Sequence, residues 1–254
     1  MSEGLKTTTF ERALVTGASS GIGRALAAAL RSLGMDVIAV GRDEQSLTRL
    51  AEECGVRPHV ADVRDVGTFA SLFKSERIDV LINNAGILSS RDRFQSMDAD
   101  LIDAMVGVNL IAPLHLARLA LPPMIKRGLG HLFFIGSSTG RYPHGNAAVY
   151  GASKAGISMF CDSLRLDLLG TGIRVTEICP GRVETRLYRT TAGEAAKSEL
   201  YDGYGAVEPA DIAKLLVTAL SLPANVDVSR LEVFPTTQAV GGSQIVKARL
   251  QASR

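Results

Sequence analysis

Tyr150 and Lys154 stand four residues apart at the start of an apolar stretch, where the sequence reads YGASK. Four residues of α-helix turn through about 400°, so the two side chains lie on one helix face about one turn apart. An ammonium favours a nearby phenolate by roughly 3 to 4 kcal/mol at about 4 to 5 Å in an effective dielectric near 20. A phenol whose pKa is ordinarily about 10 then comes within reach of neutral pH, where it can exchange a proton with a substrate. The alternative is a chance pair on a solvated helix.

Two further polar residues are candidates for the same site. Ser137 ends a predicted strand, and its hydroxyl could hold a substrate oxygen as charge changes there. Ser138 is the adjacent alternative, because neighbouring strand residues point to opposite faces. Asn109 precedes Pro113 by four residues, and proline has no N–H to bond the Asn109 carbonyl, so we expect the helix to bend there. The freed carbonyl could hold a water that links Lys154 to solvent; an incidental kink is the alternative.

A glycine-rich turn lies between the first predicted strand and the first predicted helix, in LVTGASSGIGRALAAAL. Glycines let the backbone turn sharply and approach a pyrophosphate, and the positive end of the following helix favours the anion. A turn that binds no ligand is the alternative. The residues expected to contact a dinucleotide here are Gly17, Ser19, Ser20, Gly21, Ile22 and Gly23.

The end of the second predicted strand, VIAVGRDE, bears on the choice of cofactor. Gly41 stands where an acidic residue would bind a free ribose 2′-hydroxyl, and Arg42 offers a guanidinium suited to a 2′-phosphate. Asp43 could in principle meet a hydroxyl, but it could equally cap the helix that starts at Glu44. We therefore expect NADP(H) rather than NAD(H).

More cofactor contacts are expected where the third and fourth strands end. Asp62, with Val63 beside it, could bind the adenine amino group or could be a turn residue. The stretch INNAG ends the fourth strand with small residues, among them Asn84, Ala85 and Gly86, along which a flat cofactor could pass.

Short apolar runs alternate with segments of helical period, which predicts a single α/β domain over residues 1–254, doubly wound around a mostly parallel sheet of seven strands. The strands are expected at 13–16, 37–40, 57–61, 79–83, 131–136, 173–178 and 231–234. The helices are expected near 22–33, 44–54, 66–75, 98–126, 149–169 and 209–221. Residues 182–207 are expected to form a substrate loop, and 238–254 a C-terminal tail.

Composition argues against several classes of partner. The 254 residues include 28 basic and 26 acidic ones without a basic block, which disfavours nucleic acid as a partner. We found no apolar stretch of the roughly 18 to 20 residues that cross a membrane, and the polar start is not a signal peptide, so we expect a cytoplasmic protein. Three cysteines without a paired motif suit buried, reduced thiols, and four scattered histidines predict no metal site.

The motifs TGASSGIG, NNAG, YGASK and PGRVET, together with Asn109 and Ser137, resemble those of the short-chain dehydrogenase/reductase family from about residue 10 to 240. The resemblance implies that Tyr150 is the general acid/base and that Lys154 lowers its pKa and binds the nicotinamide ribose. It also implies that Ser137, the serine of the family pattern that ends at Gly140, positions the carbonyl and that Asn109 supports a proton relay.

Within the family, several segments are similar to the NADP-dependent 3-hydroxy acid dehydrogenases. The resemblance implies that Pro180, Val183 and Thr185 lie near the nicotinamide and that the protein forms a homotetramer or homodimer. It implies a small carbonyl/alcohol substrate such as a 3-hydroxy acid or semialdehyde, or alternatively a 3-oxoacyl thioester. A non-catalytic dinucleotide-binding sensor or scaffold is the alternative outside enzymes. Candidates for the substrate side are Arg141, Arg182, Arg186, Tyr142, His144 and Tyr188, and a solvated surface position is the alternative for each arginine.

Overall fold

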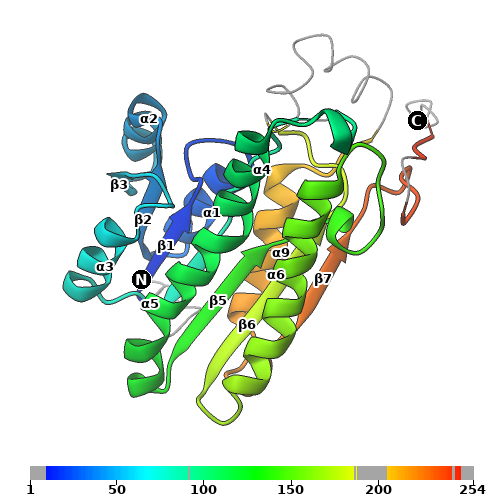
Figure 1. Ribbon diagram of the computed structural model, residues 1–254. Helices are drawn as coiled ribbons and strands as arrows, with labels where there is room; N and C mark the ends of the chain where they lie inside the picture. Colours follow the sequence, from blue (N-terminus) through cyan, green and yellow to red (C-terminus); the bar gives the residue numbers. More distant parts are fainter. Residues whose placement is uncertain (1–9, 91, 186, 188–204, 242–243, 247–254) are drawn as a thin grey trace, which may run out of the picture.

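A parallel sheet of seven strands runs through the computed structural model, which describes residues 10–90, 92–185, 187, 205–241 and 244–246. The strands lie in the order β3-β2-β1-β4-β5-β6-β7, with helices on both faces (Figure 1). The predicted doubly wound α/β fold is confirmed, and each strand begins and ends within two residues of its expected bounds. The strands are β1 (Arg12–Thr16), β2 (Asp36–Gly41), β3 (Arg57–Val60), β4 (Val80–Asn83), β5 (Gly130–Ile135), β6 (Ile173–Pro180) and β7 (Arg230–Val233).

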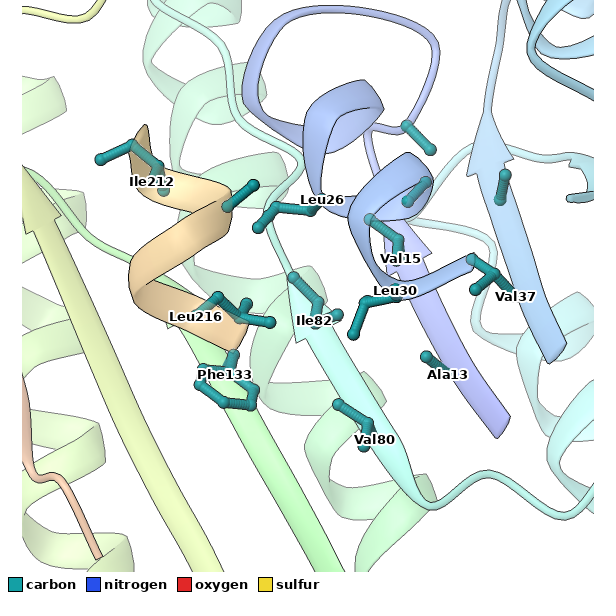
Figure 2. Packing of buried hydrophobic residues seen from close by; sticks show 14 of the residues in the cluster. Ala13, Val15, Leu26, Leu30, Val37, Val80, Ile82, Phe133, Ile212 and Leu216 are labelled. Carbon is teal, nitrogen blue, oxygen red and sulfur yellow. The ribbon is translucent and has the colours of Figure 1, made fainter. Parts of the chain in front are cut away.

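One face of the sheet is covered by α1 (Gly21–Ser32), α2 (Glu44–Cys54) and α9 (Pro209–Ser221). Neighbouring strand residues point to opposite faces, so Ala13 and Val15 of β1 enter this core while Leu14 enters the other. Figure 2 shows Leu26 of α1 and Leu216 of α9 against these strands. Burial of this apolar surface holds α1, and with it the glycine-rich turn, against the sheet.

The opposite face is covered by α3 (Val66–Ser75), α4 (Ala99–Val106), α5 (Ala112–Arg127) and α6 (Ala148–Asp167). The single helix expected over 98–126 is interrupted by a π-helical turn, η2 (Gly107–Ile111), in which the Ala112 N–H bonds the Gly107 carbonyl five residues back. Pro113 follows this turn and cannot donate to Asn109. The irregularity predicted at Asn109 is therefore a widened turn rather than a simple bend.

The continuous helical stretch Ala99–Arg127 corrects one expectation from the sequence. It has 29 residues and contains an 18-residue segment with a mean hydropathy of 1.5, so it is long and apolar enough to span a membrane by length and composition. Many of its apolar side chains nevertheless pack in the core, among them Leu116, Ala117 and Met124, whereas Ile111 and Ile125 are exposed. The buried side chains make the stretch a core helix of the fold.

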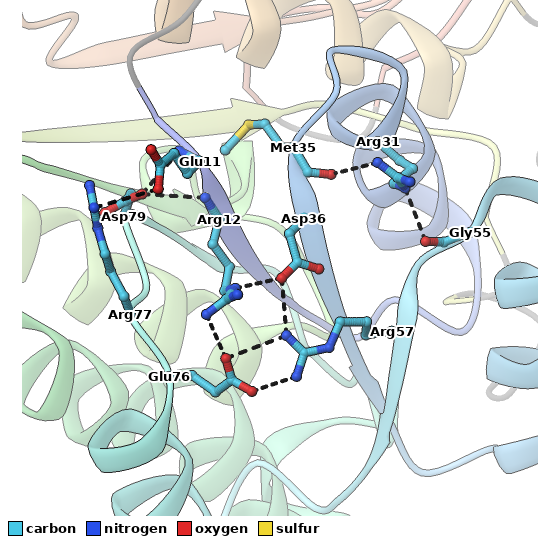
Figure 3. Close-up of polar contacts among 10 residues, drawn as sticks. All are labelled: Glu11, Arg12, Arg31, Met35, Asp36, Gly55, Arg57, Glu76, Arg77 and Asp79. Carbon is cyan, nitrogen blue, oxygen red and sulfur yellow. Dashed lines mark hydrogen bonds and ion pairs between the residues drawn. The ribbon is translucent and has the colours of Figure 1, made fainter.

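Charged side chains gather at the amino edge of the sheet (Figure 3). Arg12 of β1 and Arg57 of β3 both pair with Asp36 of β2 and with Glu76, which follows α3. Hydrogen bonds from Arg57 lower the pKa of Glu76. This network ties three strand starts together at the edge opposite the candidate site.

Candidate active site

A cleft of about 350 Å³ lies along the carboxyl edge of the sheet, lined by residues that follow β1 to β6. Parallel strands deliver their carboxyl ends to one edge, and this edge is where open α/β sheets bind ligands. The cleft brings together most of the residues predicted from the sequence. Those that line it are Gly17, Ser19, Ser20, Gly21, Ile22, Arg42, Asp62, Val63, Asn84, Ala85, Gly86, Ser137, Tyr150, Lys154, Pro180, Val183 and Thr185.

The glycine-rich turn has the backbone shape that a phosphate cradle needs. Gly17 and Gly21 have φ values of +67° and +53°, a region in which other L-residues are strained. The Ser20 side chain, at the N-cap of α1, makes no capping hydrogen bond. The first N–H groups of α1 consequently point toward the cleft without a side-chain partner from that residue, as an anion requires.

Gly23 lies outside the cleft lining, where it allows close contact between the turn and the sheet. A Cβ at Gly23 would stand 2.2 Å from the Gly17 carbonyl oxygen and 2.5 Å from Asn84 Nδ2. Asn84 Nδ2 donates to the Thr16 carbonyl at 2.8 Å, so this amide also joins the end of β4 to the turn. Gly23 and Asn84 thus hold the turn close to the end of β4.

Arg42 is exposed at the end of β2 and lines the cleft. It makes no hydrogen bond or ion pair with any residue that the structure describes. Asp43 takes the capping role: its Oδ1 accepts from Ser46 N–H at 3.0 Å and its Oδ2 from Ser46 Oγ at 2.7 Å. The interpretation of Asp43 as the N-cap of α2 is confirmed, and it leaves Arg42 as the charged group of this turn that lines the cleft.

Asp62 lines the cleft but is engaged by a neighbour that the sequence did not single out. Arg64 donates from Nη2 to Asp62 Oδ2 at 2.7 Å, and from Nε and the backbone N–H to Oδ1. These hydrogen bonds lower the pKa of Asp62 to about 2. The turn interpretation of Asp62 is therefore observed, while an oxygen lone pair can still face a ligand in the cleft.

Tyr150 and Lys154 share one face of α6, as their spacing predicts. Lys154 Nζ lies 5.9 Å from the centre of the Tyr150 ring and donates to the Ile135 carbonyl at 2.7 Å. Only 4% of Lys154 is exposed. Burial lowers the pKa of Lys154 to about 8, against the opposing effect of Cys179 and Glu177 nearby. The amine is therefore mostly an ammonium at neutral pH and can favour a phenolate beside it.

Ser137 lines the cleft directly after β5, and its neighbour Ser138 does not. Ser137 Oγ accepts from the Thr139 N–H at 3.1 Å and donates to Thr139 Oγ1 at 3.2 Å. Gly140 closes this turn: a Cβ there would lie 2.7 Å from the Lys154 carbonyl carbon. The turn therefore seats Ser137 directly against the helix that carries Tyr150 and Lys154.

Asn109 is buried behind the cleft rather than in its lining. Its Oδ1 accepts from the Ile87 N–H at 2.8 Å, and its Nδ2 donates to the Ile87 carbonyl at 2.9 Å. Gly86 lies between the Asn109 amide and the Lys154 ammonium. A Cβ at Gly86 would be 3.4 Å from Asn109 Oδ1 and 3.5 Å from Lys154 Nζ. The side chain thus holds the segment after β4, a contact that the proline argument did not anticipate.

The segment after β6 folds back over the glycine-rich turn. Thr185 Cγ2 would lie 3.2 Å from a Cβ at Gly21, and Val183 is buried in a bridge to Val207. The predicted substrate loop leaves and returns through this bridge; its residues 186 and 188–204 lie outside the described residues, as do 242–243 and 247–254 of the predicted tail.

The four candidates for the substrate side that the structure describes do not line the cleft. Arg141 Nε pairs with Glu232 at 2.7 Å, and the Tyr142 hydroxyl donates to the same carboxylate at 3.2 Å. The Arg182 backbone N–H donates to Gln238. His144 bonds the Tyr142 carbonyl through Nδ1, and Arg186 and Tyr188 fall outside the described residues.

Sequence reasoning missed the apolar end of the cleft and the lysine's carbonyl partner. Leu88 and Leu187 line the cleft and belong to a small apolar cluster with Tyr150, Val149 and Met105. The apolar pattern of each helix predicts that Met105 of α4 and Val149 of α6 are buried. It does not predict that the two helices meet at these residues. Of the three cysteines, Cys161 and Cys179 are buried as expected, whereas Cys54 is partly exposed.

The lining as a whole fits a dinucleotide. The glycine-rich turn at α1, the exposed guanidinium of Arg42 and the buried ammonium of Lys154 are groups that could hold a pyrophosphate, a 2′-phosphate and a ribose hydroxyl respectively. Ser137 and Tyr150 add hydroxyl groups to the same lining. The arrangement can bind a phosphorylated dinucleotide and exchange a proton at one end of it.

Comparison with known proteins extends over most of the chain. A sequence profile described as short chain dehydrogenase matches residues 11–195. An uncharacterized short-chain type dehydrogenase/reductase from Sinorhizobium fredii is 52% identical over 94% of this chain and 96% of that protein. Sulfoacetaldehyde reductase 2 from Chromohalobacter salexigens is 40% identical over 89% of this chain and 94% of its own length. A solved structure of serine dehydrogenase, in its closed form with NADP+, has a TM-score of 0.86 and 32% identity, covering 96% of this chain and 99% of that one.

Proposed function

The chain belongs to the short-chain dehydrogenase/reductase family, and from this premise we propose that it interconverts a small carbonyl compound and its alcohol with NADP(H). The observation that carries the proposal is that Ser137, Tyr150 and Lys154 line the same cleft as the glycine-rich turn. An oxidoreductase that uses a dinucleotide needs both a phosphate-binding turn and proton-exchanging groups in one site.

The cofactor would be held by the chain's own polar and glycine residues. The α1 N–H groups behind Gly21 would bind the pyrophosphate, and Arg42 would pair with the 2′-phosphate. Val183 and Thr185 would lie near the nicotinamide. When bound, NADPH supplies a hydride to the carbonyl carbon. The solved structure of serine dehydrogenase, a protein similar to this chain, is a complex with NADP+, which supports this choice of cofactor.

Tyr150 is the residue we assign to proton transfer. In the reducing direction its phenol donates a proton to the carbonyl oxygen, and in the oxidising direction its phenolate takes the proton back. The Lys154 ammonium, held by the Ile135 carbonyl, stabilises the phenolate in both directions. Ser137 Oγ is free to turn toward the substrate oxygen, because its bond to Thr139 Oγ1 at 3.2 Å is long for two hydroxyl groups. Asn109 supports a relay by holding the backbone beside Lys154.

A small substrate is favoured, such as a 3-hydroxy acid or the corresponding semialdehyde. Sulfoacetaldehyde reductase 2 and serine dehydrogenase are named for compounds of two and three carbons that carry an anionic group. In this chain Leu88 and Leu187 narrow the cleft beside Tyr150, which suits a short carbon chain. We assign residues 182–207 to the substrate loop. A 3-oxoacyl thioester is the alternative substrate.

The test is a substrate screen that follows the absorbance of NADPH at neutral pH. We expect malonic semialdehyde, sulfoacetaldehyde or a similar short aldehyde to oxidise NADPH, and Tyr150→Phe to lower kcat by about 10²-fold or more, because general acid–base catalysis contributes that much. The affinity for NADPH, measured by fluorescence titration, should stay within about threefold in the variant, because the phenol is not a phosphate ligand.

Two outcomes separate this proposal from its alternative, a dinucleotide-binding sensor or scaffold. Equal turnover by wild type and Tyr150→Phe contradicts the assigned proton donor. Binding of NADPH without turnover of any short carbonyl or thioester favours a sensor. Ser138→Ala serves as the matched control, since Ser138 adjoins Ser137 but does not line the cleft.

We also propose that the protein is a cytoplasmic homotetramer or homodimer. Support comes from large apolar side chains left exposed on the helices of one sheet face, among them Ile111, Ile125, Met159 and Leu166. Residues 111 and 125, and residues 159 and 166, are separated by multiples of seven, so each pair shares one face of its helix. A second copy of this chain would cover these faces.

A further inference from the structure

A carboxylate is buried beneath the backbone of the active site. Glu177 lies on β6, and none of its surface is exposed. Its side chain does not line the cleft, and the proposed reaction does not use it. A buried charge is costly unless it is paired and hydrogen-bonded, so its partners indicate what it does there.

Two elements hold the carboxylate in one orientation. Glu177 Oε2 accepts from Arg230 Nε of β7 at 2.7 Å, and Oε1 accepts from Ser158 Oγ of α6 at 2.5 Å. Arg230 also donates to Asp162 of α6 at 2.9 Å. The remaining titratable neighbours are Cys161 and Cys179, and burial raises the pKa of both thiols, which keeps them uncharged.

The carboxylate lies directly against Gly136, in the segment that carries two groups of the site. A Cβ at Gly136 would stand 2.5 Å from Glu177 Oε1, so only glycine fits above this side chain. Gly136 is preceded by Ile135, whose carbonyl accepts from Lys154, and is followed by Ser137. Any movement of Glu177 would therefore shift the backbone that presents both partners.

The charge of Glu177 also acts on the buried lysine. Ser158, which donates to the Glu177 carboxylate, follows Lys154 by four residues and so shares its face of α6. The negative charge of the carboxylate acts to raise the pKa of Lys154. The other groups that face Lys154 are the Tyr150 ring of α6, the amide of Asn109 across Gly86 and the Cys179 thiol of β6. Cys179 and Glu177 can both oppose the effect of burial on Lys154. Because burial raises the pKa of the Cys179 thiol and keeps it uncharged at neutral pH, Glu177 is the one of the two that carries a negative charge there.

We propose that Glu177 is a positioning residue for the reaction: it supports the Ile135–Ser137 backbone and supplies the negative charge that keeps Lys154 an ammonium in a dry site. This inference rests on the proposed function, which assigns Lys154 the task of stabilising the Tyr150 phenolate. It predicts that neutralising Glu177 moves the titration of Lys154 without removing any group from the cleft.

The direct test follows Lys154 itself in the full-length protein without substrate. Lysine is labelled with ¹³C at Cε, the Lys154 resonance is assigned with Lys154→Met, and its midpoint is measured by NMR. We expect a midpoint near pH 8 in wild type. Glu177→Gln, which keeps the size of the side chain and its contact with Ser158, should lower the midpoint by about one pH unit, or tenfold in proton affinity. Glu177→Asp keeps the charge and should recover more than half of that shift.

An unchanged midpoint in folded Glu177→Gln overturns the proposal. If Glu177→Gln leaves Arg230 unpaired and does not fold, Glu177→Gln combined with Arg230→Met removes both charges. The midpoint should still fall in this double variant, because the negative charge that raises the pKa of Lys154 has been removed; an unchanged or raised midpoint again overturns the proposal. Because the titration needs no substrate, its result stands even if the screened aldehydes are not turned over, an outcome that contradicts only the proposed function.

Turnover gives a second readout that a purely structural role would not move. The alkaline limb of kcat for NADP+-dependent alcohol oxidation should move to lower pH in Glu177→Gln by the same amount as the Lys154 midpoint. Glu76→Gln is the matched control, since it removes two ion pairs at the opposite edge of the sheet. It should lower stability and leave the limb in place.

Discussion

At the scale of a single residue, we propose that Arg42 selects NADP(H) over NAD(H). Its guanidinium is exposed in the cleft and unpaired with any described side chain, while neighbouring Asp43 is occupied as the cap of α2. An unpaired guanidinium binds a phosphate through charge-assisted hydrogen bonds worth about 1.5 to 3 kcal/mol. We predict that Arg42→Ala weakens NADPH binding by about 10- to 100-fold and leaves NADH binding nearly unchanged.

Fluorescence titrations with both cofactors measure this difference. Arg49→Ala is the control, because Arg49 lies on α2 but does not line the cleft. A variant that loses affinity for NADPH and NADH equally would argue against a 2′-phosphate contact. So would an Arg42→Ala protein that still prefers NADPH as strongly as wild type.

Residue types and spacing were enough to find the groups that can do chemistry, because those groups carry their own signals. Tyr150 and Lys154 lie on one helix, so the helical repeat alone places them together. Partners from distant strands leave no such signal: Arg141 meets Glu232, and Glu177 meets Arg230, only after β5, β6 and β7 pair. The same limit applied to Asp62, whose partner Arg64 depends on the conformation of the turn.

At the scale of elements, the junction of β1 and α1 depends on one close contact. Gly23 has no room for a side chain, because a Cβ would lie 2.2 Å from the Gly17 carbonyl oxygen. Backbone cannot yield as a flexible side chain can, so α1 would have to move away from the turn. We predict that Gly23→Ala costs about 1 to 3 kcal/mol in the free energy of unfolding and weakens NADPH binding at least about tenfold.

Urea unfolding and a cofactor titration measure the two effects. Gly145→Ala is the matched control, because nothing lies within 4 Å of a Cβ at Gly145 and its φ is not positive. Gly23 does not line the cleft, so any loss of affinity must come through displacement of the turn. A Gly23→Ala protein with the stability and NADPH affinity of Gly145→Ala would contradict this account.

Alternation of strands and helices was predictable because hydrophobic period distinguishes them over many residues. The break in the helix over 98–126 was only partly so. Pro113 marks where a backbone bond is lost, but a bend and a π turn both tolerate that loss. The side chain of Asn109 bonds both backbone groups of Ile87, and that contact depends on the position of β4, which no local pattern of residues 105–115 encodes.

At the scale of the whole molecule, the two edges of the sheet have different tasks. Paired charges at the amino edge, such as Arg57 with Glu76, hold the strand starts together. The carboxyl edge keeps Arg42 and Lys154 available to a ligand in the cleft. The ion pairs that fix the amino ends of the strands are therefore separated from the ligand-binding cleft by the length of the strands.

Assembly is the remaining property of the whole molecule, and the exposed apolar faces of α5 and α6 make it testable. Leu166 is 75% exposed and Met159 is 67% exposed, so a subunit alone leaves both in water. A charge buried at such a contact has no partner and costs several kcal/mol. We predict that Leu166→Glu converts the assembled protein to smaller species, with at least about tenfold weaker association, as seen by light scattering after size-exclusion chromatography.

Val60→Glu is the control, since Val60 is a similarly exposed apolar residue on edge strand β3. A monomeric wild type, or a Leu166→Glu protein of unchanged mass, would mean that these faces stay in contact with solvent.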